Sequence, residues 1–345
     1  MSNKRFHIVL WLLIAMLLAL VVGNLLIGSV KIPASEIINI LLGDVPSKQS
    51  WSIIIMQSRL PMIITAALAG AALSISGLLL QTAFNNPLAG PSILGVSTGA
   101  SLGVAIVMLM FSGMLGTLFG STIGGYVSIL LGAMVGAMAI LVVLLIFSSF
   151  VKSATMLLII GIMVSYLASS AISFLNFFAT QEGVHSYVIW GLGNFSGVTM
   201  SQMPIFSTLI IIGLAWSALM VKPLNALLLG ERYAENLGIN IKSTRNKLLL
   251  ITGILTAVTT AFCGPIGFLG LVVPHIARLL LNSSNHNALI PITILSGTVI
   301  ALLCTLISVL PTSIGIIPIN AITPVIGVPI IIYIILNRRK IQYFN

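Results

Sequence analysis

The chain is 345 residues long, 58% of its residues are hydrophobic and 6% are charged, and its formal net charge is +10 at pH 7. Ordinary soluble domains carry roughly 25% charged residues, so a water-soluble protein of this size could not cover its surface with so few charges. The composition excludes a soluble globular protein and indicates an integral membrane protein in contact with the lipid bilayer.

The first apolar run covers residues 8–28 and follows Lys4 and Arg5. At about 20 residues it matches the hydrocarbon core of a bilayer, and it is longer than the roughly 7–15 residues of a signal-peptide core. No Ala-x-Ala-like cleavage site follows it. We therefore expect an uncleaved first membrane span.

Further apolar runs of bilayer length recur along the chain, separated by Gly, Pro, Asn or charged residues. With the first run, they lie at 8–28, 60–82, 92–111, 122–147, 155–178, 202–221, 247–264, 268–281, 289–310 and 319–337. They predict an all-α, polytopic membrane protein in which residues 1–345 form one domain with about ten transmembrane helices. Within 247–281, the stretch "CGPIGFLGLVVPHIARLL" contains Pro265, Pro274 and three glycines, so we expect one short or broken span there.

Small residues recur at four-residue spacing within these runs, as at Gly99 and Gly103 and at Gly132 and Gly136. Such faces let helix backbones approach closely in lipid, where dispersion packing replaces the hydrophobic effect. We expect close helix packing at these positions, with the lining of a pore as the alternative.

The basic residues select the orientation of the spans. An even number of spans places both termini on one side. With the termini inside, cytoplasmic segments hold 12 of the 15 basic residues, and outer segments hold the other three, Lys31, Lys48 and Arg59. The positive-inside rule therefore predicts cytoplasmic termini, and it accounts for the net charge without a nucleic-acid partner or another anionic surface ligand.

Two long polar segments then fall on the outer side, at 30–58 and 181–202. In the first, we expect Ser35 to cap a short amphipathic helix. The apolar face of that helix would comprise Ile37, Ile38, Leu41 and Leu42. In the second, Tyr187 and Trp190 suit a helix that lies in the membrane interface.

Chemistry-bearing groups are sparse within the spans. No Asp, Glu, Lys or Arg lies near the centre of an expected span, which disfavours proton-coupled transport, because ion coupling needs a group that changes charge there. The stretch "GLGNFSG" at 191–197 lacks the GxxxxGK[ST] spacing of a phosphate loop. His275 and His286 are too isolated for a metal site, and the two cysteines suit small buried hydrophobes. We therefore expect no catalytic residue, metal or cofactor bound by this chain, and any energy for transport would come from a partner.

The stretch 222–247, expected in the cytoplasm, holds seven of the 20 charged residues. Pro223 and Glu231 suit helix starts, and Gly230 and Gly238 suit helix ends, so this insert predicts two short helices. Its apolar residues recur at three- and four-residue steps: Leu224, Leu227, Leu228, Ala234, Leu237 and Ile241. Such short helices need a surface to dock on, and both a cytoplasmic partner and the underside of the chain's own bundle remain open.

Five motifs occur in order along the chain. They are "SRLPMIITAALAGAALSISGLLLQ" from Ser58, "NPLAGPSILGVSTGAS" from Asn86, "LNALLLGERYAENLGI" at 224–239, "GPIGFLGLVVPHIARLL" from Gly264 and "PVIGVPIII" from Pro324. Together they resemble the FecCD-type permeases, the membrane subunits of ABC importers for iron-siderophore complexes, haem and vitamin B12. The resemblance covers nearly the whole chain from about residue 55.

The resemblance implies a type II ABC importer permease architecture in the bacterial cytoplasmic (inner) membrane. Two permease subunits, identical or paralogous, would enclose a translocation path at their interface. Two cytoplasmic ABC ATPase subunits, which bind ATP and Mg²⁺, would dock beneath them, and an extracytoplasmic substrate-binding protein would dock outside. The chain would then be a transport subunit and not an enzyme, and its cargo would be a metal chelate, first an iron-siderophore complex and otherwise cobalamin or haem.

The resemblance also implies roles for three groups of residues. The insert matches coupling helices that rest in a groove of each ATPase, with contacts expected from Leu224, Leu227, Leu228, Gly230, Glu231, Ala234, Leu237 and Gly238. An inner gate is expected at Asn86, Pro87 and Leu88 and at Ser153, Ala154 and Thr155. Docking of the binding protein is expected at Arg59, Lys31 and Lys48. Met62, Val309 and Ile316 stand where relatives often carry charges, which weakens the case for docking by charge pairs.

Two other functions fit the sequence. An ATP-independent facilitator or channel is compatible with the uncharged spans but leaves the insert unexplained. A non-transporting membrane scaffold would use the insert only to recruit a cytoplasmic protein.

Overall fold

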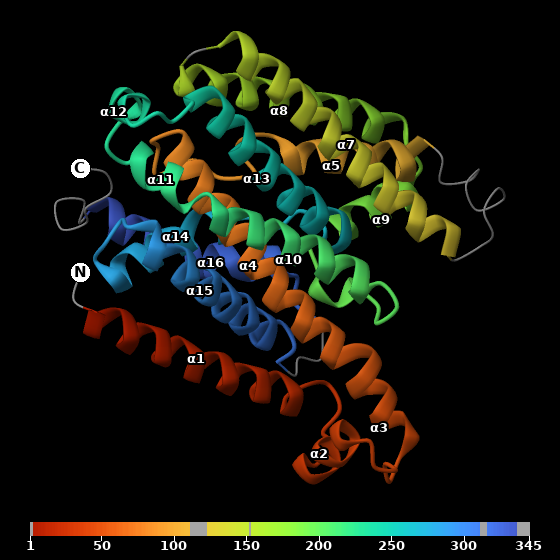
Figure 1. The fold of residues 1–345 in the computed structure, drawn as a ribbon. Helices are drawn as coiled ribbons and strands as arrows, with labels where there is room; N and C mark the ends of the chain where they lie inside the picture. The colour runs from red at the N-terminus through yellow and green to blue at the C-terminus, as the bar shows by residue number, and fades with distance from the viewer. Residues whose placement is uncertain (1–2, 111–122, 152, 311–315, 337–345) are drawn as a thin grey trace.

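The computed structural model describes residues 3–110, 123–151, 153–310 and 316–336. Every regular element in this part of the chain is helical, which confirms the predicted all-α class (Figure 1). The helices are α1 (Asn3–Leu26), α2 (Ala34–Leu42), α3 (Gln49–Ile53), α4 (Leu60–Ala83), α5 (Val96–Ala105), α7 (Ile123–Phe150), α8 (Ala154–Phe178), α9 (Gln181–Gly191), α10 (Met203–Leu219), α11 (Val221–Leu227), α12 (Glu231–Asn236), α13 (Ile241–Cys263), α14 (Leu269–Leu281), α15 (His286–Ser308) and α16 (Ile319–Leu336).

Within the described ranges, six continuous helices are long and apolar enough to cross a membrane. They are Lys4–Leu26, Gln49–Ala83, Val127–Phe150, Ala154–Phe178, Ile241–Cys263 and His286–Ser308. α10 and α11 form a seventh span if the bent pair is counted as one. Shorter apolar helices occupy the other predicted runs, at Val96–Met110, Leu269–Leu281 and Ile319–Tyr333. Each predicted run thus contains a helix, while the number of ten spans stays a prediction.

The centre of the bundle is built from α4, α13 and α15, which are mostly buried. α4 packs against both of the others and against α10 and α14. Few residues of α1, α7 and α8 are buried, and Figure 1 shows α1 on one side of the bundle and α7 and α8 on the opposite side. Since these peripheral helices are apolar, their exposed faces need lipid or another chain against them.

Helix pairs meet through glycine, as predicted. A Cβ atom added to Gly103 of α5 would overlap the backbone of Gly132 in α7. One added to Gly77 of α4 would overlap the backbone of Gly270 in α14. The missing side chains let the backbones touch, so that dispersion contacts hold helices together in lipid.

The polar segments separate to the two ends of the bundle. The start of α1 lies at the same end as α11 and α12, whereas α2, α3 and α9 lie at the other end (Figure 1). This separation is the one expected if the insert and the N-terminus share one side of the membrane and the segments 30–58 and 181–202 share the other. Which end faces the cytoplasm stays a prediction.

Two predicted boundaries are wrong. The second span does not begin near residue 60, because a single helix runs from Gln49 to Ala83 through a π-helical turn at Ile54–Arg59. α13 begins at Ile241, because the side chain of Asn240 caps it by accepting a hydrogen bond from the Ser243 N–H at 2.9 Å. Residues 241–247 therefore belong to this span and not to the insert.

The short span expected between 247 and 281 is present as α14. It has 13 residues with Pro274 inside it, so it is about 20 Å long, against roughly 30 Å for a bilayer core. Phe268 precedes it with φ of +67°, a left-handed value that is uncommon for a residue with a side chain.

Ser35 does not cap α2. The helix starts one residue earlier, at Ala34, with Pro33 in the N-cap position and no side-chain cap bond. Its buried residues are Ile37 and Ile40, whereas Ile38, Leu41 and Leu42 are exposed. The predicted apolar face is wrong because five apolar residues among six positions left several faces possible.

Candidate functional site

The charged insert folds as the two predicted short helices, α11 and α12. α11 bends by 53° away from α10, and it begins at Val221, so that Pro223 is its third residue and not its first. Gly230 separates the two helices with φ of +99°, a value that glycine adopts without strain.

Gly238 ends α12, as predicted. Its φ is +81°, and its N–H donates to the carbonyl of Glu235 at 2.8 Å. The next N–H, of Ile239, donates to the carbonyl of Ala234 at 3.0 Å. These two bonds form a Schellman motif, which satisfies carbonyl groups that the helix end would leave unpaired.

The apolar residues of the insert divide between two faces. Leu224 and Ala234 are fully buried against the chain's own bundle, and Leu227 and Leu228 are half-buried. Leu237, by contrast, has 58% of its surface exposed. The predicted contact set therefore contains both residues that seat the insert and residues that face outward.

Two exposed residues of the insert escaped the sequence analysis, Leu229 and Tyr233. Leu229 is 58% exposed and Tyr233 is 52% exposed. Tyr233 and Leu237 are four residues apart and share one side of α12. We call Leu229, Tyr233 and Leu237 the outward apolar residues; the polar residues Glu231, Arg232, Glu235 and Asn236 are exposed on the same short helix. The sequence carries no signal for them, because the break at Gly230 interrupts the helical spacing between Leu229 and Tyr233.

Asn225 fastens α11 to the core. Its side-chain oxygen accepts from the His286 N–H at 2.8 Å and lies 3.0 Å from Nδ1 of the same residue. The other ring nitrogen, Nε2, lies 2.9 Å from Oγ1 of Thr82 near the end of α4. A short polar chain therefore joins α11 to the start of α15 and to the end of α4.

The two segments predicted as an inner gate lie on different elements. Pro87 is tied to α14, because its carbonyl lies 2.8 Å from Nε2 of His275. Asn86 accepts from the Leu88 N–H at 2.9 Å, and Leu88 is exposed. No hydrogen bond given for the described residues joins this loop to the second segment.

The second segment, Ser153, Ala154 and Thr155, forms the start of α8. Ser153 is its N-cap and accepts from the Met156 N–H at 3.4 Å. Ala154 is half-buried and Thr155 is exposed. A gate formed by both segments stays a prediction.

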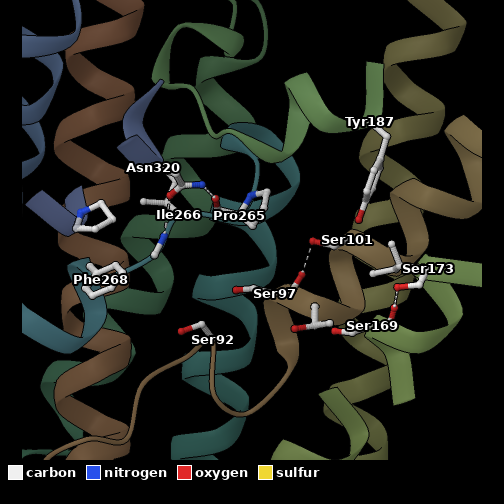
Figure 2. Close-up of a pocket in the computed structure, with 14 residues that line it drawn as sticks. Ser92, Ser97, Ser101, Ser169, Ser173, Tyr187, Pro265, Ile266, Phe268 and Asn320 are labelled. Atoms are coloured by element: carbon white, nitrogen blue, oxygen red, sulfur yellow. Dashed lines mark hydrogen bonds between the residues drawn. The ribbon is translucent and has the colours of Figure 1, made fainter. Parts of the chain in front are cut away.

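A polar cavity of about 570 Å³ lies between α5, α8 and α9, the loop at 265–268 and α16 (Figure 2). Half of its lining residues carry a hydroxyl group: Ser92, Ser97, Thr98, Ser101, Ser169, Ser173 and Tyr187. No charged residue lines it among the described parts of the chain. Such a wall suits an uncharged surface that exchanges hydrogen bonds with hydroxyl groups.

Figure 2 shows Asn320 and Pro265 on one side of the cavity and the serines of α8 on the other, with Ser97 and Ser101 between them. Ser101 donates to the carbonyl of Ser97 at 3.0 Å, a bond within α5 that leaves the oxygen lone pairs facing outward. Ser169 and Ser173 make the same bond at 3.0 Å within α8. In the sequence, this wall corresponds to pairs of serines four residues apart on two neighbouring apolar runs.

Asn320 shapes the loop that borders the cavity. Its amide donates to the carbonyl groups of Pro265 at 2.6 Å and Gly191 at 3.2 Å, and its oxygen accepts from the Gly267 N–H at 3.1 Å.

On the opposite wall, burial raises the pKa of the Tyr187 phenol above its usual value, so that this group stays a neutral donor.

Arg59 does not face outward. It is 4% exposed, and its guanidinium donates to the carbonyl oxygen of Leu25 in the last turn of α1 and to that of Val30 in the loop that follows. It therefore pairs carbonyl groups that a helix end leaves without intrahelical partners. We withdraw it from the docking residues. Lys31 and Lys48 are both exposed, and Nζ of Lys48 lies 5.1 Å from the ring centroid of Trp51.

The three positions that lack the charges common in relatives lie together. Met62, Val309 and Ile316 all line a second cavity of about 260 Å³ beside Arg59. This part of the bundle, at the end that carries α2 and α3, is therefore mostly apolar, which leaves few charged groups there for charge-paired docking.

Comparison with known proteins gives a family and relatives. A family model described as the FecCD transport family matches residues 14–337. The vitamin B12 import system permease protein BtuC of Citrobacter koseri is 34% identical over 286 residues, which cover 83% of this chain and 84% of that protein. The BtuC of Klebsiella pneumoniae is 33% identical, with 83% of each chain covered. A solved ABC transporter assigned to the metal-chelate type, in an inward-facing conformation, has a TM-score of 0.81 at 29% identity and covers 96% of this chain and 98% of that one.

Proposed function

The chain belongs to the FecCD transport family, and from this premise we propose that it is the permease subunit of an ATP-driven ABC importer that carries a metal chelate into the cytoplasm. Two ABC ATPase subunits would bind ATP and Mg²⁺ and hydrolyse ATP. A second permease subunit, identical or paralogous, would complete the translocation path, and an extracytoplasmic binding protein would deliver the cargo. The chain would span the bacterial inner membrane with both termini in the cytoplasm.

The proposal rests most on the outward apolar residues of the insert. Leu229, Tyr233 and Leu237 are more than half exposed on a segment too short to be a membrane span. Aromatic and aliphatic residues at a polar rim are typical of surfaces that bind another protein. The sequence carries no phosphate loop of its own, so a docked ATPase would supply the energy.

Displacement of the insert has a route into the spans. The bonds of Asn225 and His286 join α11 to α15 and α4, two of the three central helices. Movement of a docked ATPase against α12 would then tilt the core and not only the insert. Rigid helices packed at native density transmit such displacements over their whole length.

The translocation path would run beside the polar cavity. α8, which forms one wall, exposes Tyr166, Phe174 and Phe177. A second permease subunit laid over α8 would cover these rings, and the cavity would then lie between the two subunits. Lipid is the alternative cover for the outer part of this helix.

The cargo proposed first is an iron-siderophore complex, with cobalamin and haem as the alternatives. The cavity wall offers neutral hydroxyl and amide groups, which can exchange hydrogen bonds with the polar shell of a chelated metal. Relatives named as vitamin B12 permeases support cobalamin as the second choice.

Purification of the full chain with its associated proteins tests the coupling part of this proposal. An ABC ATPase is expected to co-purify with the wild-type chain and to dissociate from a Tyr233→Asp/Leu237→Asp variant, because a carboxylate in an apolar groove stays poorly solvated. A chain that imports its cargo with no ATPase present would instead be a facilitator. Equal recovery of the ATPase with both chains would rule out the insert as its docking site.

A further inference from the structure

The first two turns of α13 hold the end of α7. Nζ of Lys242 donates to the carbonyl of Ser149 at 3.0 Å. One turn later, the side-chain oxygen of Asn246 accepts from the Ser148 hydroxyl at 2.7 Å, and Ser148 is almost fully buried. The last turn of α7, which leads to the corner with α8, is therefore attached to α13.

The same turns of α13 also hold α12. Nη2 of Arg245 lies 2.8 Å from Oε1 of Glu231, the first residue of α12. Arg245 is 5% exposed and Glu231 is 48% exposed. A buried guanidinium is costly without a partner, so this pair constrains α12 more than an exposed pair would.

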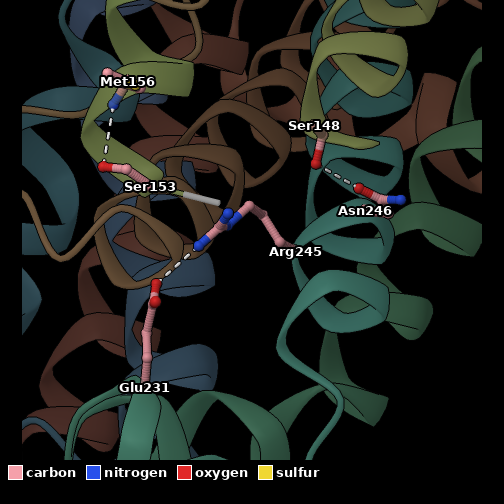
Figure 3. Close-up of polar contacts among 6 residues, drawn as sticks. All are labelled: Ser148, Ser153, Met156, Glu231, Arg245 and Asn246. Carbon is pink, nitrogen blue, oxygen red and sulfur yellow. Dashed lines mark hydrogen bonds and ion pairs between the residues drawn. The ribbon is translucent and has the colours of Figure 1, made fainter. Parts of the chain in front are cut away.

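Both attachments start from the same face of α13. Lys242, Arg245 and Asn246 are three and four residues apart, which places them side by side on a helix. Figure 3 shows Arg245 pointing away from α13 toward Glu231 and toward the start of α8 at Ser153, with Ser148 and Asn246 paired nearby. One face of α13 thus connects the insert with the α7–α8 corner.

From this geometry we infer that Arg245 is a positioning residue that transmits displacement of α12 to the α7–α8 corner. The corner carries the proposed gate residues Ser153, Ala154 and Thr155, so the link supplies a second route besides the one through Asn225 and His286. The inference rests on the proposed function, since it assigns Arg245 a part in coupling ATPase movement to the path. The ion pair itself needs no ATPase, and its effect can be measured on the chain alone.

A distance measurement on the full chain in lipid nanodiscs tests the link without transport. Spin labels at Thr155→Cys on α8 and Glu235→Cys on α12 report the distance between these exposed sites, while the native Cys263 and Cys304 are buried. We expect Arg245→Met to broaden or shift the distance distribution and the exchange Glu231→Arg/Arg245→Glu to restore it. Glu231→Gln removes the charge of the more exposed partner of the same ion pair. It replaces Arg245→Met in the experiment if that variant does not fold.

Lys247→Met is the matched control. Lys247 lies two residues after Arg245, on the opposite side of α13, and it is exposed. The distance distribution between the two spin labels in Lys247→Met should match that of the chain with Arg245 and Glu231 intact. An unchanged distribution in both Arg245→Met and Glu231→Gln overturns the inference, and so does an exchange variant that behaves like the single variants.

Transport by the complete importer supplies the second readout. With the co-purified ATPase, and with radiolabelled cyanocobalamin and a radiolabelled ferric hydroxamate siderophore as probes, Arg245→Met should lower the uptake per ATP hydrolysed about fivefold or more. The affinity for the ATPase should stay unchanged, and Arg245→Lys should recover part of the uptake. Absence of ATP-driven uptake in the unmutated complex would refute the proposed function and leave the distance result standing. Full uptake per ATP in Arg245→Met would refute the role of Arg245.

Discussion

Truncation of Tyr233 to alanine should weaken binding of the ATPase about 30-fold. An aromatic side chain buries roughly 150–250 Å² when fully covered, and Tyr233 leaves 52% of its surface exposed, so a partner could cover about 100 Å² of it. At about 25 cal/mol per Å² this area is worth about 2.5 kcal/mol, of which alanine retains a small part. A loss of about 2 kcal/mol raises the dissociation constant about 30-fold.

The assay is the dissociation constant between the permease in nanodiscs and the ATPase that co-purifies with it. Alanine favours helix, so Tyr233→Ala should leave α12 intact. Leu42→Ala is the matched control, because Leu42 is 75% exposed on α2 at the opposite end of the bundle. Leu42→Ala should bind like the unmutated chain. Equal affinity for Tyr233→Ala and the unmutated chain would refute the assignment of the docking face.

Three further predictions concern the helix packing and the end of the bundle that carries α2. Gly77→Leu should lower the free energy of unfolding by about 1–3 kcal/mol, since the leucine side chain would overlap the backbone of α14. Gly191→Ala is the control, because a Cβ atom there meets no other atom, and it should leave the melting temperature in detergent unchanged. Arg59→Met should cost about 2 kcal/mol by leaving the end of α1 unpaired, and a lower affinity for the binding protein at full stability would contradict its buried role. Hydrogen bonds from Ser47 hold the pKa of Glu36 below its usual value, so this link contributes to stability above the unfolded pKa and is lost as pH falls through the folded one. NMR titration of the Glu36 carboxyl should show a higher pKa in Ser47→Ala than in the unmutated chain. An unchanged pKa would refute a contribution of the Ser47 hydroxyl bond.

The helices were predictable because lipid imposes a simple rule on the sequence. Apolar runs of bilayer length must be helical, since every backbone group has to be satisfied within its own segment. The ends of the helices were predicted less accurately from the sequence. The start of α13 at Ile241 depends on the cap by Asn240, and this polar stretch resembled the insert in composition.

The candidate site was predictable in position but not in orientation. Gly230 and Gly238 marked the short helices correctly, because both positions have positive φ. The side of the insert that faces outward could not be derived, since Leu224 and Leu237 look alike in sequence and differ only in what covers them. Arg59 was misplaced for a similar reason: a basic residue at the end of a span suggests a surface, and only the tertiary structure shows the α1 carbonyl groups that it pairs.

ATP-dependent uptake by proteoliposomes is the decisive test of the importer function. Vesicles would contain the full chain with its co-purified ATPase and binding protein, and the probes would be radiolabelled cyanocobalamin and a radiolabelled ferric hydroxamate siderophore. The account predicts accumulation of one probe with ATP and none with a non-hydrolysable analogue. Accumulation at the same rate without ATP hydrolysis, or failure of the ATP-loaded complex to transport any metal chelate, would contradict it.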